Sequence, residues 1–495
     1  MIAVLKRKIK NEYILLFLLF LFVLSFRLYF AFQTGHFNTD DSYFHLRHIE
    51  SIVHEKSILV YDDLSYGGRL VLYPPLFHIL MALLTFGSMF MLKLIPEILI
   101  SCTVFVVYII AKNMSGNSYA ALFSALLSSF YPILFFETLN NISVYSLVIP
   151  VLFLMLYSLL NLENKFYLWF FIISSFMLPL LHSSALVFVV VIFIYFLLLT
   201  GGALTATKLK KEAVVFSILL MILLQFIIYK KAFLDYGMSV LWQNIPSNIL
   251  SDSFRKLVPI DLLIGIGLLP LIFGSFGVYL SVFREKRKID FMFVAFSISI
   301  LLLIVFRFLT ISLGLMFLGL ALSIFSSVSL SKVYSYLANL KFKHIRNLFT
   351  ILLLIAFAFS SFMPSLSAAK DSNEIANSKF KEVSWISINT KDVDTVVLGN
   401  LGEGNLIAAI GNRRNVVDSD FVLAPNPVGR AKDVEVVYTT VSEAIATSLL
   451  RKYDVKLIYL SDDTKDTYKI DSLKYAKRSK CFDSLRGGRY YVFKC

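Results

Sequence analysis

The sequence predicts a polytopic α-helical membrane protein with a small α/β domain at its C-terminal end. Of the 495 residues, 58% are hydrophobic and only 16% are charged, and the mean hydropathy is +0.75. Such a chain is far too apolar for a soluble protein of this length. Apolar runs long enough to cross a bilayer recur up to Pro364, and the composition then becomes that of a soluble domain.

About eleven apolar runs have a length suited to a transmembrane helix. The first follows a basic group at residues 6–10 and resembles a signal peptide, but no small-residue cleavage site follows it. We therefore expect it to be retained as a span. The eleven runs lie at 14–32, 95–111, 119–136, 142–161, 166–181, 184–200, 213–229, 259–282, 291–306, 308–330 and 347–364.

The run from Pro75 to Met91 is ambiguous, and the distribution of charge decides how we interpret it. If the basic N-terminus is inside and this run does not cross, the basic loops all fall on the inner side, as the positive-inside rule requires. We therefore expect a helix lying at the outer surface and entered through Pro74. The N-terminus is then cytoplasmic and the C-terminus extracytoplasmic. The basic loops contain Lys208, Lys210 and Lys211; Arg284, Lys286, Arg287 and Lys288; and Lys341, Lys343 and Arg346.

This topology places several polar groups on one face of the membrane. The predicted outer segments are the first external loop (33–94), residues 137–141, a tight turn at His182 and residues 230–258. Arg307 lies at the outer end of a span. Acids, histidines and an arginine are therefore expected to converge there.

The C-terminal part, 365–495, is predicted to form an extracytoplasmic α/β domain attached to the transmembrane domain, 1–364. Strand patterns occur at 394–400, 434–440 and 455–461, with a helical stretch before the last of them. Near the C-terminus, Gly487 and Gly488 suit a hairpin turn midway between Cys481 and Cys495. These cysteines are expected either to form a cross-strand disulfide, if this end is extracytoplasmic, or to remain free thiols.

The strongest functional candidates are Asp40 and Asp41, in the charged segment 39–77 that follows the first span. Carboxylates beside a bilayer are costly and are default candidates for function. Partial burial and mutual repulsion would raise the pKa of one of them, which suits a general base. With both ionised, they suit a hard divalent cation. A solvated loop, or a helix cap at Asp40, is the alternative.

Basic side chains of the same loop are candidate substrate contacts. Arg47 could hold a phosphate in bidentate fashion, Arg69 could be a second phosphate contact, and His45, two residues before Arg47, is a further candidate. An exposed loop arginine is the alternative for Arg69.

Three further candidates lie outside this loop. Glu137 could supply a second catalytic carboxylate, or be an acid at a span end. His182 could contact a polar headgroup, or be structural in its bend. Arg307 could bind a lipid phosphate, or extend to the headgroup region.

Other function classes lack support in the sequence. The net charge of +14 resides in the short basic loops and is not a nucleic-acid signature. No P-loop, dinucleotide-binding glycine motif, HExxH, paired CxxC or GxSxG is present. Because no cytoplasmic domain is predicted, a lipid-phosphate donor reached from the outer leaflet fits the topology better than a soluble nucleotide-linked substrate.

The first external loop resembles that of the C-type (GT-C) membrane glycosyltransferases, most closely the archaeal oligosaccharyltransferase catalytic subunit family. The resemblance lies in DDSYFHLRHIESIVH (40–54) and LVLYPPLFHILMALL (70–84), and also in residues 394–421. It implies that Asp41 matches the acid that binds a catalytic divalent cation (Mg or Mn). It further implies a helix lying in the loop, and a match of Arg307–Leu309 to a basic residue at a span end.

Two parts of the family pattern differ in this chain. The Trp-Trp-Asp-Tyr-Gly motif, which recognises the Asn-x-Ser/Thr acceptor, is replaced by Asn400–Leu401–Gly402–Glu403–Gly404. The second-loop acidic pair is reduced to Glu137. The resemblance thus implies glycosyl transfer from a polyprenyl (dolichyl) phosphate-linked donor at the outer face, to a lipid, glycan or protein. The alternatives are a protein N-glycosylating oligosaccharyltransferase with an altered acceptor site, a lipid-linked glycan flippase and a non-catalytic assembly factor.

Overall fold

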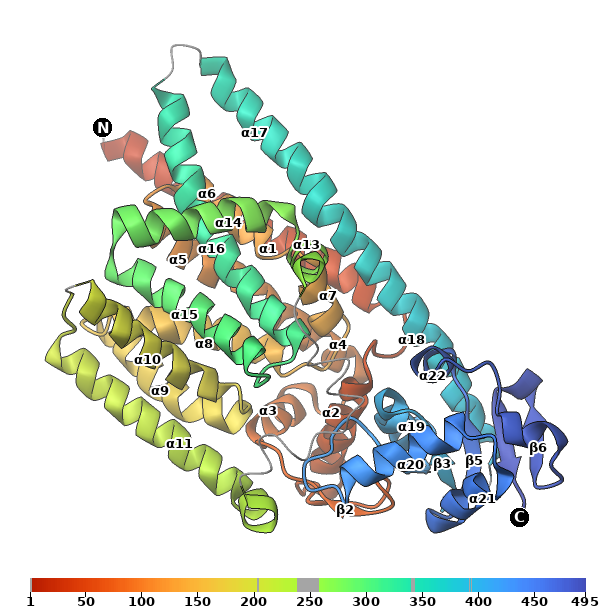
Figure 1. Ribbon diagram of the computed structural model, residues 1–495. Helices are drawn as coiled ribbons and strands as arrows, with labels where there is room; N and C mark the ends of the chain where they lie inside the picture. Colours follow the sequence, from red (N-terminus) through yellow and green to blue (C-terminus); the bar gives the residue numbers. More distant parts are fainter. Residues whose placement is uncertain (1, 203, 238–257, 340–342, 391, 393) are drawn as a thin grey trace.

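A bundle of apolar helices carries a small mixed sheet at one end, beside the loop that follows the first helix (Figure 1). The structure, a computed structural model, describes residues 2–202, 204–237, 258–339, 343–390, 392 and 394–495. Its α-helices are α1 (Ile2–Ala31), α2 (Asp40–Glu50), α3 (Leu76–Thr85), α4 (Met89–Ser101), α5 (Thr103–Ser115), α6 (Ser118–Leu127), α7 (Pro132–Thr138), α8 (Tyr145–Leu160), α9 (Lys165–Leu181), α10 (Ala185–Gly201), α11 (Lys208–Tyr236), α13 (Pro259–Ile266), α14 (Leu268–Leu280), α15 (Lys288–Val305), α16 (Ile311–Ala338), α17 (Lys343–Phe357), α18 (Met363–Asn389), α19 (Gly404–Ala409), α20 (Pro427–Thr439), α21 (Glu443–Lys452) and α22 (Asp462–Tyr468).

The chain is a multi-pass membrane protein. Within the described residues, seven helical segments are long and apolar enough to cross a bilayer, and α6 with α7, bent by 56°, makes up to eight. Three shorter apolar helices, α8, α9 and α10, lie where further spans are predicted. The count of eleven therefore stays a prediction. The seven segments are Asn11–Ala31, Met89–Ser115, Lys208–Tyr236, Leu268–Glu285, Lys288–Val305, Ile311–Ala338 and His344–Asn389.

The ambiguous run after Pro75 forms the ten-residue helix α3. Ten residues of α-helix extend about 15 Å, half of the hydrocarbon thickness of a bilayer, so α3 is too short to cross it. The chain turns at Phe86, which is left-handed (φ +49°), and the next span starts at Met89, six residues earlier than predicted. Of the predicted outer segment 230–258, residues 238–257 lie outside the described part of the chain. Lys341, in a predicted inner loop, does as well.

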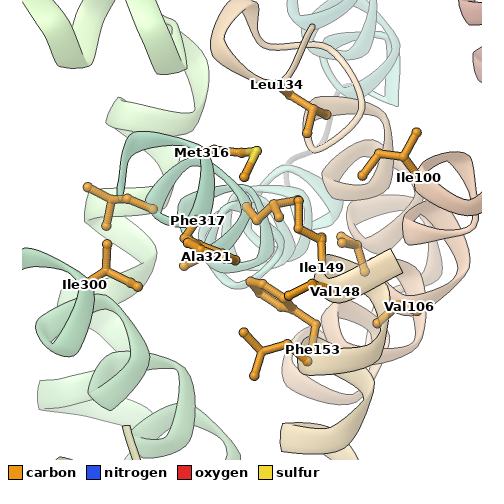
Figure 2. Close-up of a cluster of buried hydrophobic side chains, with 14 of the residues drawn as sticks. Ile100, Val106, Leu134, Val148, Ile149, Phe153, Ile300, Met316, Phe317 and Ala321 are labelled. Atoms are coloured by element: carbon orange, nitrogen blue, oxygen red, sulfur yellow. The ribbon is translucent and has the colours of Figure 1, made fainter. Parts of the chain in front are cut away.

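Helix α16 lies in the centre of the bundle. Its Met316, Phe317 and Ala321 pack among buried side chains of α8 and α15 (Figure 2). On another side α14 approaches so closely that a Cβ at Gly277 would lie 2.1 Å from the carbonyl oxygen of Phe325. Small residues permit such close packing of helix backbones in membranes, where lipid tails are as apolar as the side chains.

The C-terminal domain contains a five-stranded sheet in the order β4–β3–β5–β7–β6. The first three strands are parallel, and the last two are antiparallel to their neighbours. A separate two-stranded ribbon, β1–β2, lies in the first external loop. The strands are β1 (Tyr61–Asp62), β2 (Arg69–Leu70), β3 (Val396–Leu398), β4 (Arg414–Asn415), β5 (Val455–Tyr459), β6 (Phe482–Leu485) and β7 (Tyr490–Phe493).

One expectation for this region needs correction, and the domain boundary stays a prediction. The predicted strand at 434–440 is wrong, because these residues belong to helix α20 and to the residue that ends it. The Asn426 side chain caps this helix, Pro427 starts it, and Ala431, Val434 and Val437 are buried on one face at helical spacing. In addition, the helix continues through the boundary expected at 364/365. Residues 344–389 form one helical segment, and the sheet begins only at β3.

The β6–β7 hairpin has the turn and the cysteine pairing that its sequence allows. Gly487 and Gly488 take positive φ values of 67° and 88° in the turn. Phe482 pairs with Phe493, and Cys481 and Cys495 form a disulfide, with Cα atoms 5.1 Å apart. Of the two alternatives left open by the sequence, the structure has the disulfide, and Cys102 is the remaining free cysteine.

Candidate active site

Asp40 joins the first external loop to the C-terminal domain. It is the first residue of α2, and its carboxylate accepts hydrogen bonds from the backbone N–H of Leu406 (2.8 Å) and the side-chain amide of Asn405 (2.9 Å). Burial raises the pKa of Asp40 to about 7, and the charge of Asp41 adds to the rise, while these hydrogen bonds oppose it. Asp40 thus caps α19, a different helix from the one that the capping alternative suggested.

Asp41 is the more open of the two acids. Asp41 is exposed, and its carboxylate accepts a hydrogen bond from the Ser419 hydroxyl (3.1 Å). The pKa of Asp41 is raised because surrounding protein partly desolvates the carboxyl and because Asp418 is negatively charged; the Ser419 hydrogen bond opposes this rise. An accessible carboxyl with a raised pKa has the properties of a general base.

The structure brings Glu137 and His182 to the same place as Asp41. Glu137, near the end of α7, is hydrogen-bonded to Ser312 in the first turn of α16 and interacts electrostatically with Asp41. Tyr145, at the start of α8, interacts with both acids, and its hydroxyl lies 3.5 Å from Nε2 of His182. Segments far apart in sequence therefore gather these groups around Asp41.

His45 lies beside His182 but is engaged with a third histidine. Its Nδ1 is 2.8 Å from Nε2 of His78, and a proton on His182 would further disfavour a proton on His45. Burial lowers the pKa of His45 to about 3. His45 is therefore neutral at physiological pH and can contribute hydrogen bonding, but not positive charge, to a phosphate.

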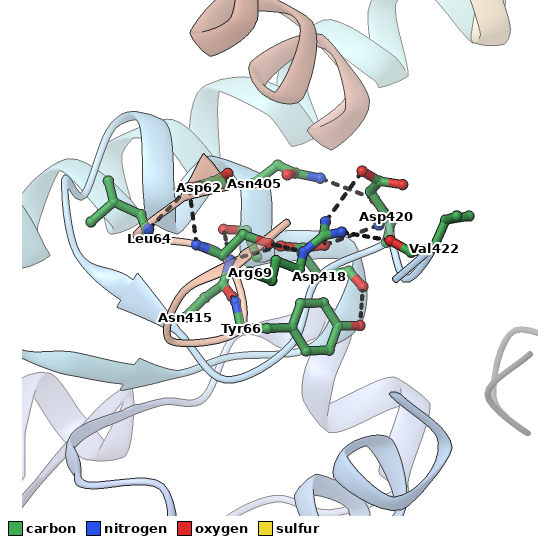
Figure 3. Close-up of polar contacts among 12 residues, drawn as sticks. Asp62, Leu64, Tyr66, Arg69, Asn405, Asn415, Asp418, Asp420 and Val422 are labelled. Carbon is green, nitrogen blue, oxygen red and sulfur yellow. Dashed lines mark hydrogen bonds and ion pairs between the residues drawn. The ribbon is translucent and has the colours of Figure 1, made fainter. Parts of the chain in front are cut away.

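The two loop arginines have carboxylate partners instead of open faces. Arg47 makes a bidentate ion pair with Asp62 (2.8 and 2.5 Å). Arg69 is buried and contacts Asp420 (3.2 Å) and Asp418 (3.5 Å), as Figure 3 shows. Since these acids already occupy both guanidinium groups, we remove Arg47 and Arg69 from the predicted phosphate contacts.

Arg307 has a different environment. It lies in the connection between α15 and α16, in a left-handed conformation (φ +60°), and its side chain is exposed. It precedes by five residues Ser312, the hydrogen-bond partner of Glu137. A positive charge is thus presented close in sequence to the polar cluster.

The sequence did not identify the acids of the C-terminal domain. Asp418 is fully buried, and its carboxylate accepts a hydrogen bond from Ser65 (2.6 Å), while Tyr66 donates to its carbonyl oxygen (2.9 Å). Burial raises the pKa of Asp420 to about 6, with Arg69 opposing this shift and Asp418 and Asp41 adding to it. The available signal was the acid-Ser-acid sequence directly after β4, inside the segment that carries the family resemblance.

Gly404, the last residue of the stretch that replaces the family motif, has a packing role. A Cβ at this position would lie 2.2 Å from the Val417 carbonyl oxygen and 2.5 Å from Cβ of Asp418. Only glycine lets α19 approach the segment that carries Asp418 and Ser419 so closely.

The residues present do not fit the predicted divalent cation. In the described ranges, no three His, Cys, Asp or Glu side chains are arranged to hold a metal ion. The Asp40 carboxylate is engaged by Asn405 and Leu406, and those of Asp418 and Asp420 contact Arg69. Asp41 as a metal ligand therefore finds no support in this arrangement, and we derive no reaction step through a metal.

Comparison with known proteins gives matches at the level of three-dimensional structure. Neither a protein-family model nor a curated protein matches the chain. The apo oligosaccharyltransferase of Archaeoglobus fulgidus superposes with a TM-score of 0.66 and 14% identity, over 96% of this chain and 74% of that one. ArnT of Cupriavidus metallidurans, bound to undecaprenyl phosphate, superposes with a TM-score of 0.54 and 11% identity, over 96% and 97% of the two chains.

This chain has the GT-C fold. The predicted fold class is thereby confirmed, although the identities are too low to carry more than the fold. The archaeal enzyme has also been solved with an inhibitory peptide and dolichol-phosphate (TM-score 0.64, 14% identity, 89% of this chain and 69% of that one). A further structure of it contains Zn and sulfate (TM-score 0.62, 15% identity, 88% and 67%).

Proposed function

We propose that this GT-C protein transfers a sugar or oligosaccharide from a polyprenyl-phosphate-linked donor to an acceptor. The observation that carries the proposal is the contrast between Asp41 and the acids around it. Asp40, Asp418 and Asp420 are occupied by hydrogen bonds or by Arg69, whereas Asp41 is exposed and has Ser419 as its hydrogen-bond donor. Asp41 therefore has a carboxylate free to act on a substrate.

In the proposed reaction, the acceptor atom attacks the anomeric carbon of the donor. The bond between this carbon and the phosphate oxygen breaks, and the polyprenyl phosphate leaves. Asp41 takes the proton of the acceptor as general base, and its raised pKa suits this role near neutral pH. Glu137 assists from α7, and Asp40 holds the helix that carries Asp41 against α19.

The phosphate of the donor would be held by Arg307, with His45 and His182 as hydrogen-bonding groups; His182 is neutral like His45, because burial lowers its pKa to about 4. Two solved structures with this fold contain a polyprenyl phosphate, dolichol-phosphate in one and undecaprenyl phosphate in the other. This likeness supports the same class of lipid as partner here.

We place the cluster and the C-terminal domain on the outer face, with the N-terminus in the cytoplasm. The disulfide between Cys481 and Cys495 supports this orientation, because disulfides persist in oxidising compartments and not in the cytosol. The domain division at residue 364 is kept as a division of function: the helices before it hold the lipid donor, and the part after it supplies Asp418, Ser419 and Asp420.

The acceptor separates the proposal from its nearest rival, a protein N-glycosylating enzyme. Asn400–Gly404 forms a short helical turn in which Glu403 is buried and accepts a hydrogen bond from the Asn400 N–H (3.2 Å). This turn offers no aromatic platform like that of the Trp-Trp-Asp-Tyr-Gly motif. We therefore favour an acceptor other than the Asn-x-Ser/Thr peptide.

A direct test uses the full chain in nanodiscs with a short-chain polyprenyl-phosphate hexose. We expect release of polyprenyl phosphate coupled to hexose transfer onto a lipid, glycan or protein fraction. Movement of the lipid-linked sugar across the bilayer without transfer would instead indicate a flippase. Loss of Asn-linked glycans in a deletion strain, measured by mass spectrometry, would favour the N-glycosylating rival.

The pH dependence of transfer should respond to Ser419. Transfer requires ionised Asp41, so the rate is expected to fall as the pH drops through the raised pKa of this acid. The Ser419 hydroxyl stabilises the ionised form, so Ser419→Ala should raise that pKa further and move the acidic limb of the kcat/KM profile to higher pH. An unmoved or lowered limb would contradict the role of Asp41 as base.

A further inference from the structure

Three charged residues are buried together where α1 and α4 meet. Arg27 of α1 and Glu97 of α4 are 1% and 0% exposed, and Lys93 of α4 is 4% exposed. Charges inside apolar helices are costly, and when present they are paired and commonly have a functional role. The proposed reaction does not use these three groups directly.

The pair of Arg27 and Glu97 is hydrogen-bonded to the segment that follows Glu137. Arg27 donates from Nε to Glu97 (2.6 Å) and from Nη2 to the Thr138 hydroxyl (3.0 Å). The second oxygen of Glu97 accepts the backbone N–H of Asn140 (2.6 Å). Asn140 is held in the left-handed conformation (φ +53°), which costs energy for a residue other than glycine. Both residues therefore act on one short segment, 138–140.

Lys93 secures the same segment to the start of the first external loop. Its ammonium donates to the side-chain oxygen of Asn140 (2.8 Å) and to the carbonyl oxygens of Ala31, Thr34 and His36 (2.8, 2.8 and 2.9 Å). None of these acceptors carries a charge, so the lysine serves to fix backbone in place.

Residues 138–142 are in turn hydrogen-bonded to α2, which carries Asp41, and to Asn38 just before it. The Asn140 side-chain amide donates to Asn38 (2.9 Å), and Asn38 donates to the Leu139 carbonyl oxygen (3.3 Å). The backbone N–H of Ile142 donates to Ser42, the residue after Asp41 (3.1 Å). Residues 138–142 thus connect Glu137 on one side with the Asp41 helix on the other.

We propose that Arg27, Glu97 and Lys93 form a positioning unit that fixes Glu137 relative to Asp41. This inference rests on the proposed function, in which these two acids act on one substrate. A buried ion pair adds little stability compared with apolar residues of similar volume. The contacts of Arg27, Glu97 and Lys93 go to residues 138–140, the segment beside the two acids. Precise placement of the acids requires such contacts, whereas simple packing of α1 against α4 does not.

The test compares Glu97→Gln with Asp290→Asn in the full chain. Asp290 is a matched control: it is fully buried and is ion-paired to Arg287 (2.8 Å), but the pair lies at the start of α15, the opposite end of that helix from Arg307. We expect Glu97→Gln to lower kcat at least tenfold with KM for the donor within twofold, and Asp290→Asn to leave kcat within twofold. An unchanged kcat in Glu97→Gln overturns the proposal.

Hydrogen exchange gives a second readout that needs no enzymatic activity. The Asn140 backbone N–H donates to the Glu97 carboxylate, and Glu97→Gln removes the charge that strengthens this bond and pairs with Arg27. Exchange in a peptide covering 138–142 should therefore speed up at least tenfold in Glu97→Gln and stay unchanged in Asp290→Asn. Unchanged exchange overturns the positioning unit, even if wild-type transfer is never detected. Faster exchange together with an inactive wild type refutes only the proposed function.

Arg27→Lys covers the case in which Glu97→Gln does not fold. It keeps the positive charge but cannot reach both Glu97 and Thr138. We expect kcat between those of the wild type and Glu97→Gln, and faster exchange of 138–142. Wild-type values of both quantities would overturn the proposal.

Discussion

Replacing Asp41 by asparagine should lower the rate of sugar transfer by about 10³-fold while leaving expression and folding intact. Removal of a positioned general base costs roughly 10²–10⁴-fold in rate. Folding should be spared because Asp41 is exposed and its carboxylate accepts one hydrogen bond, from Ser419. The measurement is the initial rate of glycosyl transfer from the polyprenyl-phosphate donor, with size-exclusion chromatography as the check on folding.

Asp63→Asn provides the control for this variant. Asp63 is an exposed acid of the same external loop, so its replacement makes the same chemical change away from the cluster. Its transfer rate should stay within twofold of wild type. Retained transfer in both Asp41→Asn and Asp41→Ala would refute the assignment of Asp41 as the base.

Replacing Arg69 by methionine should give the largest loss of stability, about 3–5 kcal/mol. Removing one partner of a buried ion pair leaves an uncompensated charge in the interior, which costs about this much. Arg69 is 3% exposed and is bonded to Ser65 (2.7 Å) and to the Val422 carbonyl oxygen (2.9 Å), as well as to the two acids (Figure 3). Its loss should therefore separate the external loop from the C-terminal domain.

Thermal unfolding followed by tyrosine and tryptophan fluorescence measures this effect. Arg414→Met is the matched control, because the Arg414–Asp394 pair (3.0 Å) lies at the surface and pairs of this kind contribute about 0–1 kcal/mol. The double variant Arg69→Met/Asp420→Asn should recover part of the loss, since one stranded charge is removed. If Arg69→Met unfolds at the same temperature as Arg414→Met, the contacts of Arg69 between the external loop and the C-terminal domain are not significant for stability.

The local sequence was sufficient for much of the helix bundle. Hydrophobic length predicted the seven segments of the described chain that are long enough to cross a bilayer. The positions of basic residues indicated that the run after Pro75 does not cross, which agrees with the short helix α3. The pattern at 434–440 misled, because alternating valines favour a strand, whereas the cap at Asn426 and Pro427 starts a helix whose buried face fits the domain core. At 434–440 the alternating pattern predicted a strand and the cap predicted a helix. The tertiary packing of the buried face agrees with the cap.

The site was predictable only in its type of residue. Carboxylates beside a membrane pointed to Asp40 and Asp41, and the bend and span end pointed to His182 and Glu137. The sequence gave no means of telling which group is free. Arg47 and Arg69 looked like phosphate contacts, since their partners Asp62, Asp418 and Asp420 cannot be recognised without the fold.

The sequence by itself thus determined a membrane protein of the GT-C type with a carboxylate pair in its first loop. Only the tertiary structure separated the two acids. Asp40 is hydrogen-bonded to Asn405 and Leu406, some 365 residues away, and thereby joins the first external loop to the C-terminal domain. Asp41, its neighbour in the chain, remains open. Successive side chains of a helix point about 100° apart, so Asp40 lies against the start of α19, while Asp41 keeps one hydrogen bond to the domain, from Ser419, and lies close enough to Glu137 and Tyr145 to interact with them electrostatically.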